Sequence, residues 1–172
     1  MRAIANEAEL KAGSLYYHYK SKDELIAAVL DLGISVVISS VRRAMEVLPD
    51  TASSREQIET AIRAHLSAIV NNGDYTLVTR HVFGQVPEAI WEKNMRLRDS
   101  YAAMWERILT EAYDRGEFRS TASITMARLY ILGALNWTLE WYEPGSRTIE
   151  EIAREFASVA LFGLRCDQMA QL

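Results

Sequence analysis

The stretch Ala3–Glu24, AIANEAELKAGSLYYHYKSKDE, decides how the rest of the chain is interpreted. Its apolar residues recur at helical spacing on two short segments, with Ile4 and Ala8 on the first and Leu15 and Tyr19 on the second. Two short helices joined by a tight turn predict a helix-turn-helix.

A third helix is expected directly after the second segment. Ser21 and Glu24 have the spacing of a capping box, in which the hydroxyl accepts the Glu24 amide proton and the carboxylate accepts the Ser21 amide proton. We therefore expect a long helix from about Lys22 to Leu48, spanning on the order of 40 Å. Lys22 adds positive charge beside free amides, which suits a DNA phosphate; an ordinary solvated cap is the alternative.

The outward positions of the second segment combine a cation, hydroxyl groups and aromatic rings. Such a mixture suits contact with phosphates and base edges in a DNA major groove. These positions are Lys11, Ala12, Ser14, Tyr16, Tyr17 and His18.

Residues 1–30, MRAIANEAELKAGSLYYHYKSKDELIAAVL, resemble the DNA-binding segment of TetR-type (tetracycline-repressor-like) transcriptional regulators. The run LYYHYKSKDEL, residues 15–25, is the most specific part of the resemblance. The resemblance implies that Leu15 and Tyr19 belong to the core. It also implies that the DNA backbone is faced by Ser14, Tyr16, His18 and Lys22, and that the bases are approached by Ala12 and Gly13.

The sequence departs from the family pattern at three positions and at its front. Glu9 stands where the family commonly has glycine, Lys11 where it has a Ser or Thr cap, and Ala12 where it has a longer polar residue. Lys11 cannot accept a backbone proton, so the second helix should start weakly. Family members also have a preceding helix, so residues 1–24 read as an incomplete DNA-binding domain. Either the natural protein is longer, or it has lost that helix and robust DNA binding.

Composition indicates a soluble globular protein. The 172 residues suffice to bury a core, and 49% hydrophobic with 24% charged residues is ordinary for a globular chain. The sequence shows no apolar run approaching the length of a membrane span and no signal peptide, so we expect a cytoplasmic protein without a membrane partner. Cys166 is the only cysteine, which excludes an intrachain disulfide.

Charge is distributed unevenly along the chain. The net charge is −4, but residues 1–22 carry +2, which leaves −6 on the remainder. The charged residues of that first stretch are Arg2, Lys11, Lys20 and Lys22 against Glu7 and Glu9. This asymmetry fits a small DNA-facing end on an acidic body.

The rest of the chain has helical periodicity and no period-two alternation, so the fold should be all-α. Residues 1–24 would form the helix-turn-helix and residues 25–172 a helical ligand-binding and dimerisation domain. Two further capping boxes are expected, at Ser54–Gln57 and at Thr148–Glu151.

Residues 123–141 are apolar on nearly every face, so this helix needs cover from more than one direction. The family resemblance implies that residues 123–141 and 148–165 pair with their copies across a two-fold axis. Burial inside one chain is the competing interpretation. The candidate interface residues are Gly133, Ala134, Trp141, Ile152, Phe156, Ala160 and Gly163.

The resemblance also implies a small effector bound among the middle helices, in a pocket with aromatic walls and a few polar anchors. The candidate lining residues are Arg80, His81, Phe83, Tyr101, Trp105, Tyr130, Asn136 and Trp137. Core packing is the alternative for each aromatic residue. LGALNWTLEWYEPG, residues 132–145, further resembles regulators of fatty-acid and sterol catabolism that answer to acyl-CoA, which would need Arg80, Arg96 or Arg98 as an anchor.

Together these patterns predict a ligand-responsive dimeric regulator, a repressor released from double-stranded operator DNA by a small effector. A DNA-binding-deficient dimer that binds a small molecule or protein is the alternative. We expect no enzyme, no cofactor and no metal, because the three histidines are scattered and no glycine-rich phosphate loop appears.

Overall fold

The computed structural model describes residues 1–73, 82, 86–117 and 123–164, and these contain helices and no strand. This confirms the all-α expectation. The helices are α1 (Arg2–Glu7), α2 (Ala12–His18), α3 (Lys22–Glu46), α4 (Ser54–Asn71), α6 (Glu88–Asp114), α7 (Ile124–Trp141) and α8 (Ile149–Leu164).

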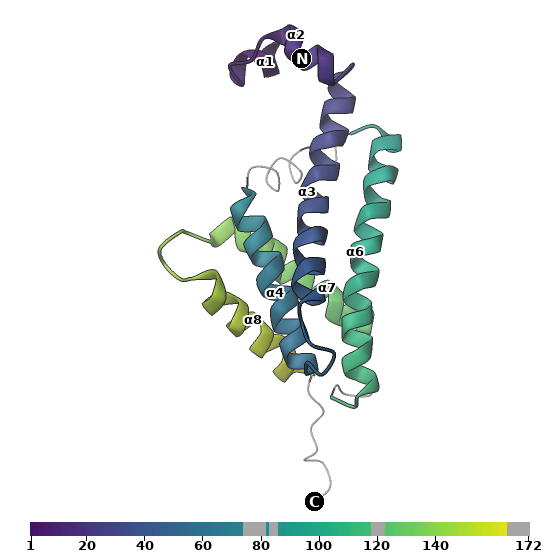
Figure 1. Cartoon of the computed structure of the whole chain (residues 1–172), viewed down its shortest axis with the longest axis vertical. Helices are drawn as coiled ribbons and strands as arrows, with labels where there is room; N and C mark the ends of the chain where they lie inside the picture. The colour runs from purple at the N-terminus through teal and green to yellow at the C-terminus, as the bar shows by residue number, and fades with distance from the viewer. Residues whose placement is uncertain (74–81, 83–85, 118–122, 165–172) are drawn as a thin grey trace, which may run out of the picture.

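The two shortest helices, α1 and α2, lie at one end of the molecule, and α3 runs from them into the helical body (Figure 1). Helix α6 lies beside α3 along most of its length. Helix α4 packs between α3 and α8, and it also contacts α6 and α7. A single continuous helix therefore joins the helix-turn-helix end to the body.

Helix α4 is the centre of the core. Ile58, Ile62, Leu66 and Ile69 recur at spacings of three and four residues, and each is at most 1% exposed. Trp105 of α6 is also fully buried and belongs to the same core. Residues at this spacing share one face of a helix, so burying them pins α4 against its neighbours.

Two capping expectations need correction. The cap of α4 is Ser53, whose Oγ accepts the Glu56 amide proton at 3.3 Å while Glu56 accepts the Ser53 amide proton at 2.9 Å. Ser54 is buried instead, and its hydroxyl donates to Glu117. At α3, the Ser21 hydroxyl accepts the Glu24 amide proton as expected. The Glu24 carboxylate, however, accepts the backbone amide proton of Lys20, one residue before the expected donor, Ser21.

The third capping box is confirmed. The Thr148 amide donates to Glu151 at 2.9 Å, and the Glu151 amide donates to the Thr148 hydroxyl at 3.2 Å. Ser123 caps α7 by accepting the Met126 amide proton at 3.3 Å. These caps fix the starts of the last two helices through backbone donors that would otherwise be unpaired.

Helix α3 also departs from the expectation that no segment is long and apolar enough to span a membrane. By length and composition alone, residues Lys22–Glu46 meet that criterion. Leu30 and Val41 of this helix are fully buried, and α4 and α6 pack along it. Leu30 and Val41 therefore contribute to packing within the body, while 28% of the apolar window of this helix is buried.

Candidate functional site

The helix-turn-helix end is held together by a few apolar contacts and a strained turn. Ala5 of α1 and Leu15 of α2 are buried, and the two helices contact each other. Between them, Glu9 adopts φ of 53°, the left-handed conformation that glycine favours. Glu9, which stands where a glycine was expected from the family resemblance, thus has the backbone conformation that glycine adopts most readily.

The candidate DNA-contacting residues are displayed at this end of the molecule (Figure 1). Tyr16 and Tyr17 are 48% and 85% exposed, which are high values for large aromatic side chains. The Tyr17 ring meets the His18 ring edge-on, with centroids 5.1 Å apart. Lys11 provides no side-chain cap to α2, as expected. The other exposed members are Gly13, Ser14, His18 and Lys22, and Ala12 is half-buried.

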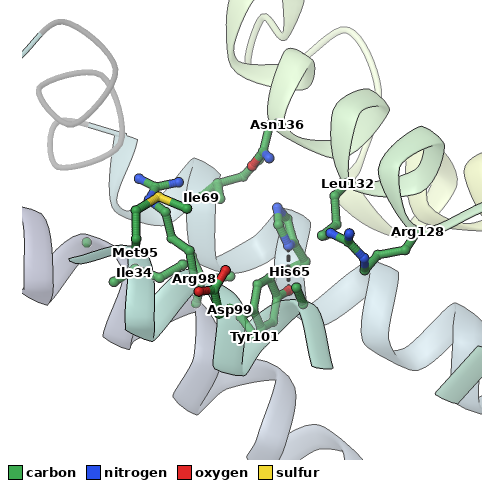
Figure 2. A pocket seen from close by; sticks show the side chains of 13 residues that line it. Ile34, His65, Ile69, Met95, Arg98, Asp99, Tyr101, Arg128, Leu132 and Asn136 are labelled. Carbon is green, nitrogen blue, oxygen red and sulfur yellow. Dashed lines mark hydrogen bonds between the residues drawn. The ribbon is translucent and has the colours of Figure 1, made fainter. Parts of the chain in front are cut away.

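A cavity of about 220 Å³ lies between α3, α4, α6 and α7. Figure 2 shows polar side chains from α4, α6 and α7 converging on it. Its apolar walls are formed by Ile34, Val37, Ile69, Met95, Ala102 and Leu132, with Gly33 of α3, and its polar members are His65, Arg98, Asp99, Tyr101, Arg128 and Asn136.

The centre of the cavity wall is a pair of buried polar rings. His65 Nδ1 lies 2.6 Å from Tyr101 Oη, and the two rings stack with centroids 5.8 Å apart. Burial lowers the pKa of His65 to about 4, with the neighbouring Asn136 side chain acting in the opposite direction. His65 is therefore neutral at pH 7. Burial also raises the pKa of Tyr101, so its phenol keeps its proton.

A chain of polar contacts leads from the cavity to α3. Arg98 Nε donates to Asn94 Oδ1 at 2.9 Å, and Asn94 Nδ2 donates to Asp31 Oδ1 at 3.2 Å. Lys93 pairs with the other oxygen of Asp31 at 2.7 Å. Burial lowers the pKa of Arg98. The fully buried Asn94 therefore connects Arg98, at the cavity, to Asp31 on the helix that carries the helix-turn-helix.

A second arginine lines the cavity from α7. Arg128 Nε lies 3.0 Å from Glu106 Oε1, and this ion pair ties α7 to α6. The arginine side chain is largely buried whereas the glutamate is more exposed. The cavity therefore has cationic groups on two of its helices, each already engaged by a protein partner.

The pocket candidates from sequence divide into three groups. Tyr101 and Asn136 line the cavity. Trp105 is fully buried and does not line it, while Tyr130 and Trp137 are exposed on α7 outside it. Arg80, His81 and Phe83 lie outside the described residues. Of the proposed anchors, Arg98 lines the cavity and Arg96 does not.

The interface candidates also divide. Ile152 and Ala160 are buried within the chain, because α8 presents them to its own core cluster. Gly133, Trp141 and Gly163 are exposed, and Ala134 and Phe156 are half-buried. Around them α7 and α8 expose large apolar residues: Met126, Leu129, Tyr130, Trp137, Val159 and Phe162.

Sequence reasoning missed His65 and Arg128 as cavity residues. His65 follows Ile58 and Ile62 at helical spacing, so a lone histidine on an apolar helix face was the available signal. Arg128 carries no such signal, because only the packing of α7 against α6 brings it inward. The position of both side chains in the cavity wall depends on which helices pack together.

A second, apolar hollow of about 320 Å³ lies near the other end of α3. It is lined by Ile4 of α1, by Lys22, Leu25, Ile26 and Val29 of α3, and by Val82 and Val86. Within the described ranges no group of three or more His, Cys, Asp or Glu side chains could hold a metal ion.

The cavity between α3, α4, α6 and α7 has both apolar and polar walls. It therefore suits noncovalent binding of a molecule that is partly apolar and partly polar.

Comparison with known proteins identifies the family. The family model described as "Tetracyclin repressor-like, C-terminal domain" matches residues 51–164, and that described as "Bacterial regulatory proteins, tetR family" matches residues 1–29. The chain belongs to the TetR family. The resemblance read from LYYHYKSKDEL is thereby confirmed, and TetR-family proteins are transcriptional regulators rather than enzymes.

TetR-family relatives cover nearly all of this chain. The HTH-type transcriptional repressor KstR2 of Rhodococcus jostii is 24% identical over 166 residues, covering 95% of this chain and 80% of its own. A TetR-family regulatory protein from Rhodococcus RHA1 has TM-score 0.84 and 21% identity, covering 97% of this chain and 86% of that one. AibR, solved with isovaleryl coenzyme A and operator DNA, has TM-score 0.74 and 19% identity, covering 95% and 85%. These structural likenesses establish the fold.

Proposed function

We propose that this TetR-family chain is a dimeric, ligand-responsive repressor, released from operator DNA by a small effector that binds the cavity. Residues 1–24 would contact DNA, and residues 25–172 would bind ligand and form the dimer. A repressor of bacterial genes acts in the cytoplasm, where its operator lies.

The observation that carries this proposal is the continuity of α3. Its residue Gly33 lines the cavity, and its first residue, Lys22, stands at the DNA-facing end. They are eleven positions apart, a distance of about 17 Å along an unbroken helix. A ligand that moves α3 at the cavity therefore moves the DNA-facing end, and a coupling of about 1–3 kcal/mol would lower operator affinity several-fold or more.

An acyl-CoA or a similar lipid-like molecule is the proposed effector class. Apolar side chains of α3, α4 and α7 offer a surface for an acyl chain or fused rings, and Arg98 and Arg128 supply positive potential. The cavity holds about seven water volumes at ~30 Å³ each, so it would take the acyl end while a nucleotide portion stayed outside. AibR, which shares the fold, binds isovaleryl coenzyme A.

A second copy of this chain is the proposed cover of α7 and α8. Both helices expose large apolar side chains, with Trp137 56% exposed. Large apolar side chains exposed together are typical of an interaction site, and a two-fold dimer buries the same face of both copies. Such a dimer would present two α2 helices to successive major grooves about 34–36 Å apart.

The test is a fluorescence anisotropy titration of labelled DNA from upstream of the gene, at two salt concentrations, with and without isovaleryl coenzyme A. Lys22→Ala should weaken binding across all salt concentrations and reduce the slope of log affinity against log salt by about one. Arg42→Ala is the matched control, because it removes an exposed charge from the same helix about 30 Å away.

Each outcome has a defined meaning. Specific binding that weakens with isovaleryl coenzyme A supports the whole proposal, and binding insensitive to it rejects this effector. If the chain binds isovaleryl coenzyme A but none of the DNA fragments, it is instead a DNA-binding-deficient dimer that binds a small molecule. Equal losses of DNA affinity in Lys22→Ala and Arg42→Ala would contradict the assignment of the DNA-facing end.

A further inference from the structure

One nitrogen of a buried histidine is left without a partner in the cavity wall. His65 is 2% exposed, and its Nε2 is buried with no hydrogen-bond partner among the described groups. Figure 2 shows that this nitrogen faces away from Tyr101, on the side of Asn136. The Asn136 carboxamide is near enough to raise the pKa of His65, yet it makes no hydrogen bond of ordinary length with it. Both residues line the cavity, so a ligand atom bound there can contact Nε2 and the carboxamide.

The neighbours of His65 determine which nitrogen carries the proton. The Tyr101 phenol is buried, and in the part of the chain that the structure describes its hydrogen-bond partner is Nδ1 of His65, at 2.6 Å. The Trp105 indole N–H is near enough to lower the pKa of Tyr101, although it makes no hydrogen bond of ordinary length to a described group. Tyr101 therefore donates to Nδ1, because the reverse arrangement would leave its own proton without an acceptor. A neutral imidazole has one proton, so Nε2 carries it and is a donor.

We propose that the cavity binds the carbonyl oxygen of an apolar effector through His65 Nε2–H, with the Asn136 carboxamide on its other side. The effector class is a molecule with an uncharged carbonyl, such as a thioester, ketone or amide, attached to an acyl chain or ring. This assignment rests on the proposed function, since it takes the cavity to be the effector site. Tyr101 is the positioning residue, because it fixes the tautomer of His65.

An uncharged acceptor fits this subsite better than an anion. His65 is neutral at pH 7 and so contributes no positive charge to balance a carboxylate or phosphate. The two lining arginines are engaged elsewhere, Arg98 with Asn94 and Arg128 with Glu106. Ile69 and Leu132 line the cavity near the polar pair and would pack against the hydrocarbon next to the carbonyl.

The first experiment compares two ligands that differ only in the carbonyl. Decanoyl-CoA and its thioether, in which CH₂ replaces C=O, are titrated by calorimetry against the full chain. We expect the thioester to bind about tenfold more tightly, as one hydrogen bond from a buried donor provides. His65→Phe and Tyr101→Phe should lose this preference while keeping thioether affinity. Tyr113→Phe, which removes a hydroxyl from α6 outside the cavity, should retain it.

The second experiment needs no ligand. In protein labelled with ¹⁵N-histidine, two-bond correlation spectra should show His65 as a neutral imidazole with its proton on Nε2 down to about pH 5. In Tyr101→Phe the tautomer signature should change, a result that a merely structural tyrosine would not produce. A proton on Nδ1 in the wild type overturns the proposal, even if His65→Phe fails to fold.

The two experiments separate this inference from the proposed function. Equal affinity for thioester and thioether overturns the His65 subsite alone and leaves the effector class standing. Binding of neither compound rejects the effector class, and the subsite with it. Operator binding is measured on every variant, so that loss of fold is recognised.

Discussion

The contacts of Asp31 allow a sharp test of what joins α3 to α6. Asp31 is contacted by two adjacent residues of α6, Lys93 through a 2.7 Å ion pair and Asn94 through a 3.2 Å hydrogen bond. Judged by distance and charge alone, the Lys93 ion pair would contribute more to stability than the Asn94 hydrogen bond. Its side chain is 62% exposed, however, whereas Asn94 is fully buried. We therefore predict that Asn94→Ala destabilises the protein far more than Lys93→Met.

The magnitudes follow from solvent access. Asn94→Ala removes the acceptor of Arg98 Nε and the donor to Asp31, both in charge-assisted bonds, for a combined loss of about 3 kcal/mol. Lys93→Met keeps the aliphatic stem and removes an exposed ion pair, which costs about 0.5 kcal/mol. For a chain of this size the expected falls in melting temperature are about 6–12 °C and about 2 °C.

The assay is urea unfolding followed by circular dichroism, at one fixed protein concentration because a dimer's stability depends on concentration. The slope m is compared across variants, so that a change in midpoint reports stability. A loss for Lys93→Met equal to or larger than that for Asn94→Ala would refute the reasoning. It would show that the ion pair, rather than the buried amide, ties α3 to α6.

Three further predictions concern other parts of the chain. Glu9→Gly should raise stability by about 0.5–1 kcal/mol in thermal unfolding, because glycine adopts the left-handed turn without the side-chain penalty; unchanged or lower stability would count against strain there. His65 has its pKa lowered to about 4 when folded, so as pH falls from about 6.5 to 4 the unfolded chain takes up the proton first and stability should fall by roughly 3 kcal/mol. Urea titrations across that range should show this loss in the wild type and a flatter profile in His65→Phe, and parallel profiles would argue against a buried neutral imidazole. Trp137→Glu, an exposed position of α7, should shift sedimentation from dimer to monomer with the helical signal unchanged; a dimer that persists would place the interface elsewhere.

Much of the fold was predictable because its signals are local. The period of apolar residues depends only on helix geometry, and the Thr148–Glu151 capping box depends on atoms three residues apart. Where two neighbouring residues could each cap a helix, burial determined which of them does. Ser53 and Ser54 could each cap α4, and Ser53 does so because Ser54 is buried against Glu117.

The cavity was only partly predictable, because its composition depends on which faces of four helices meet. Tyr101, Asn136 and Arg98 were proposed from sequence and do line it. Trp105 was proposed on the same aromatic criterion and is core, since one helical turn along α6 carries it behind Tyr101. Aromatic type alone does not distinguish a cavity wall from a core.

By itself, the sequence determined the all-helical fold, the helix-turn-helix and its family, because these depend on residues close together along the chain. Only the tertiary structure decided that His65 faces Tyr101 with a free nitrogen, that Asn94 bridges Arg98 and Asp31, and which face of α7 stays exposed. The His65–Tyr101 and Asn94–Asp31 contacts join residues 36 and 63 positions apart. Their energies come from burial, a property that packed helices create together.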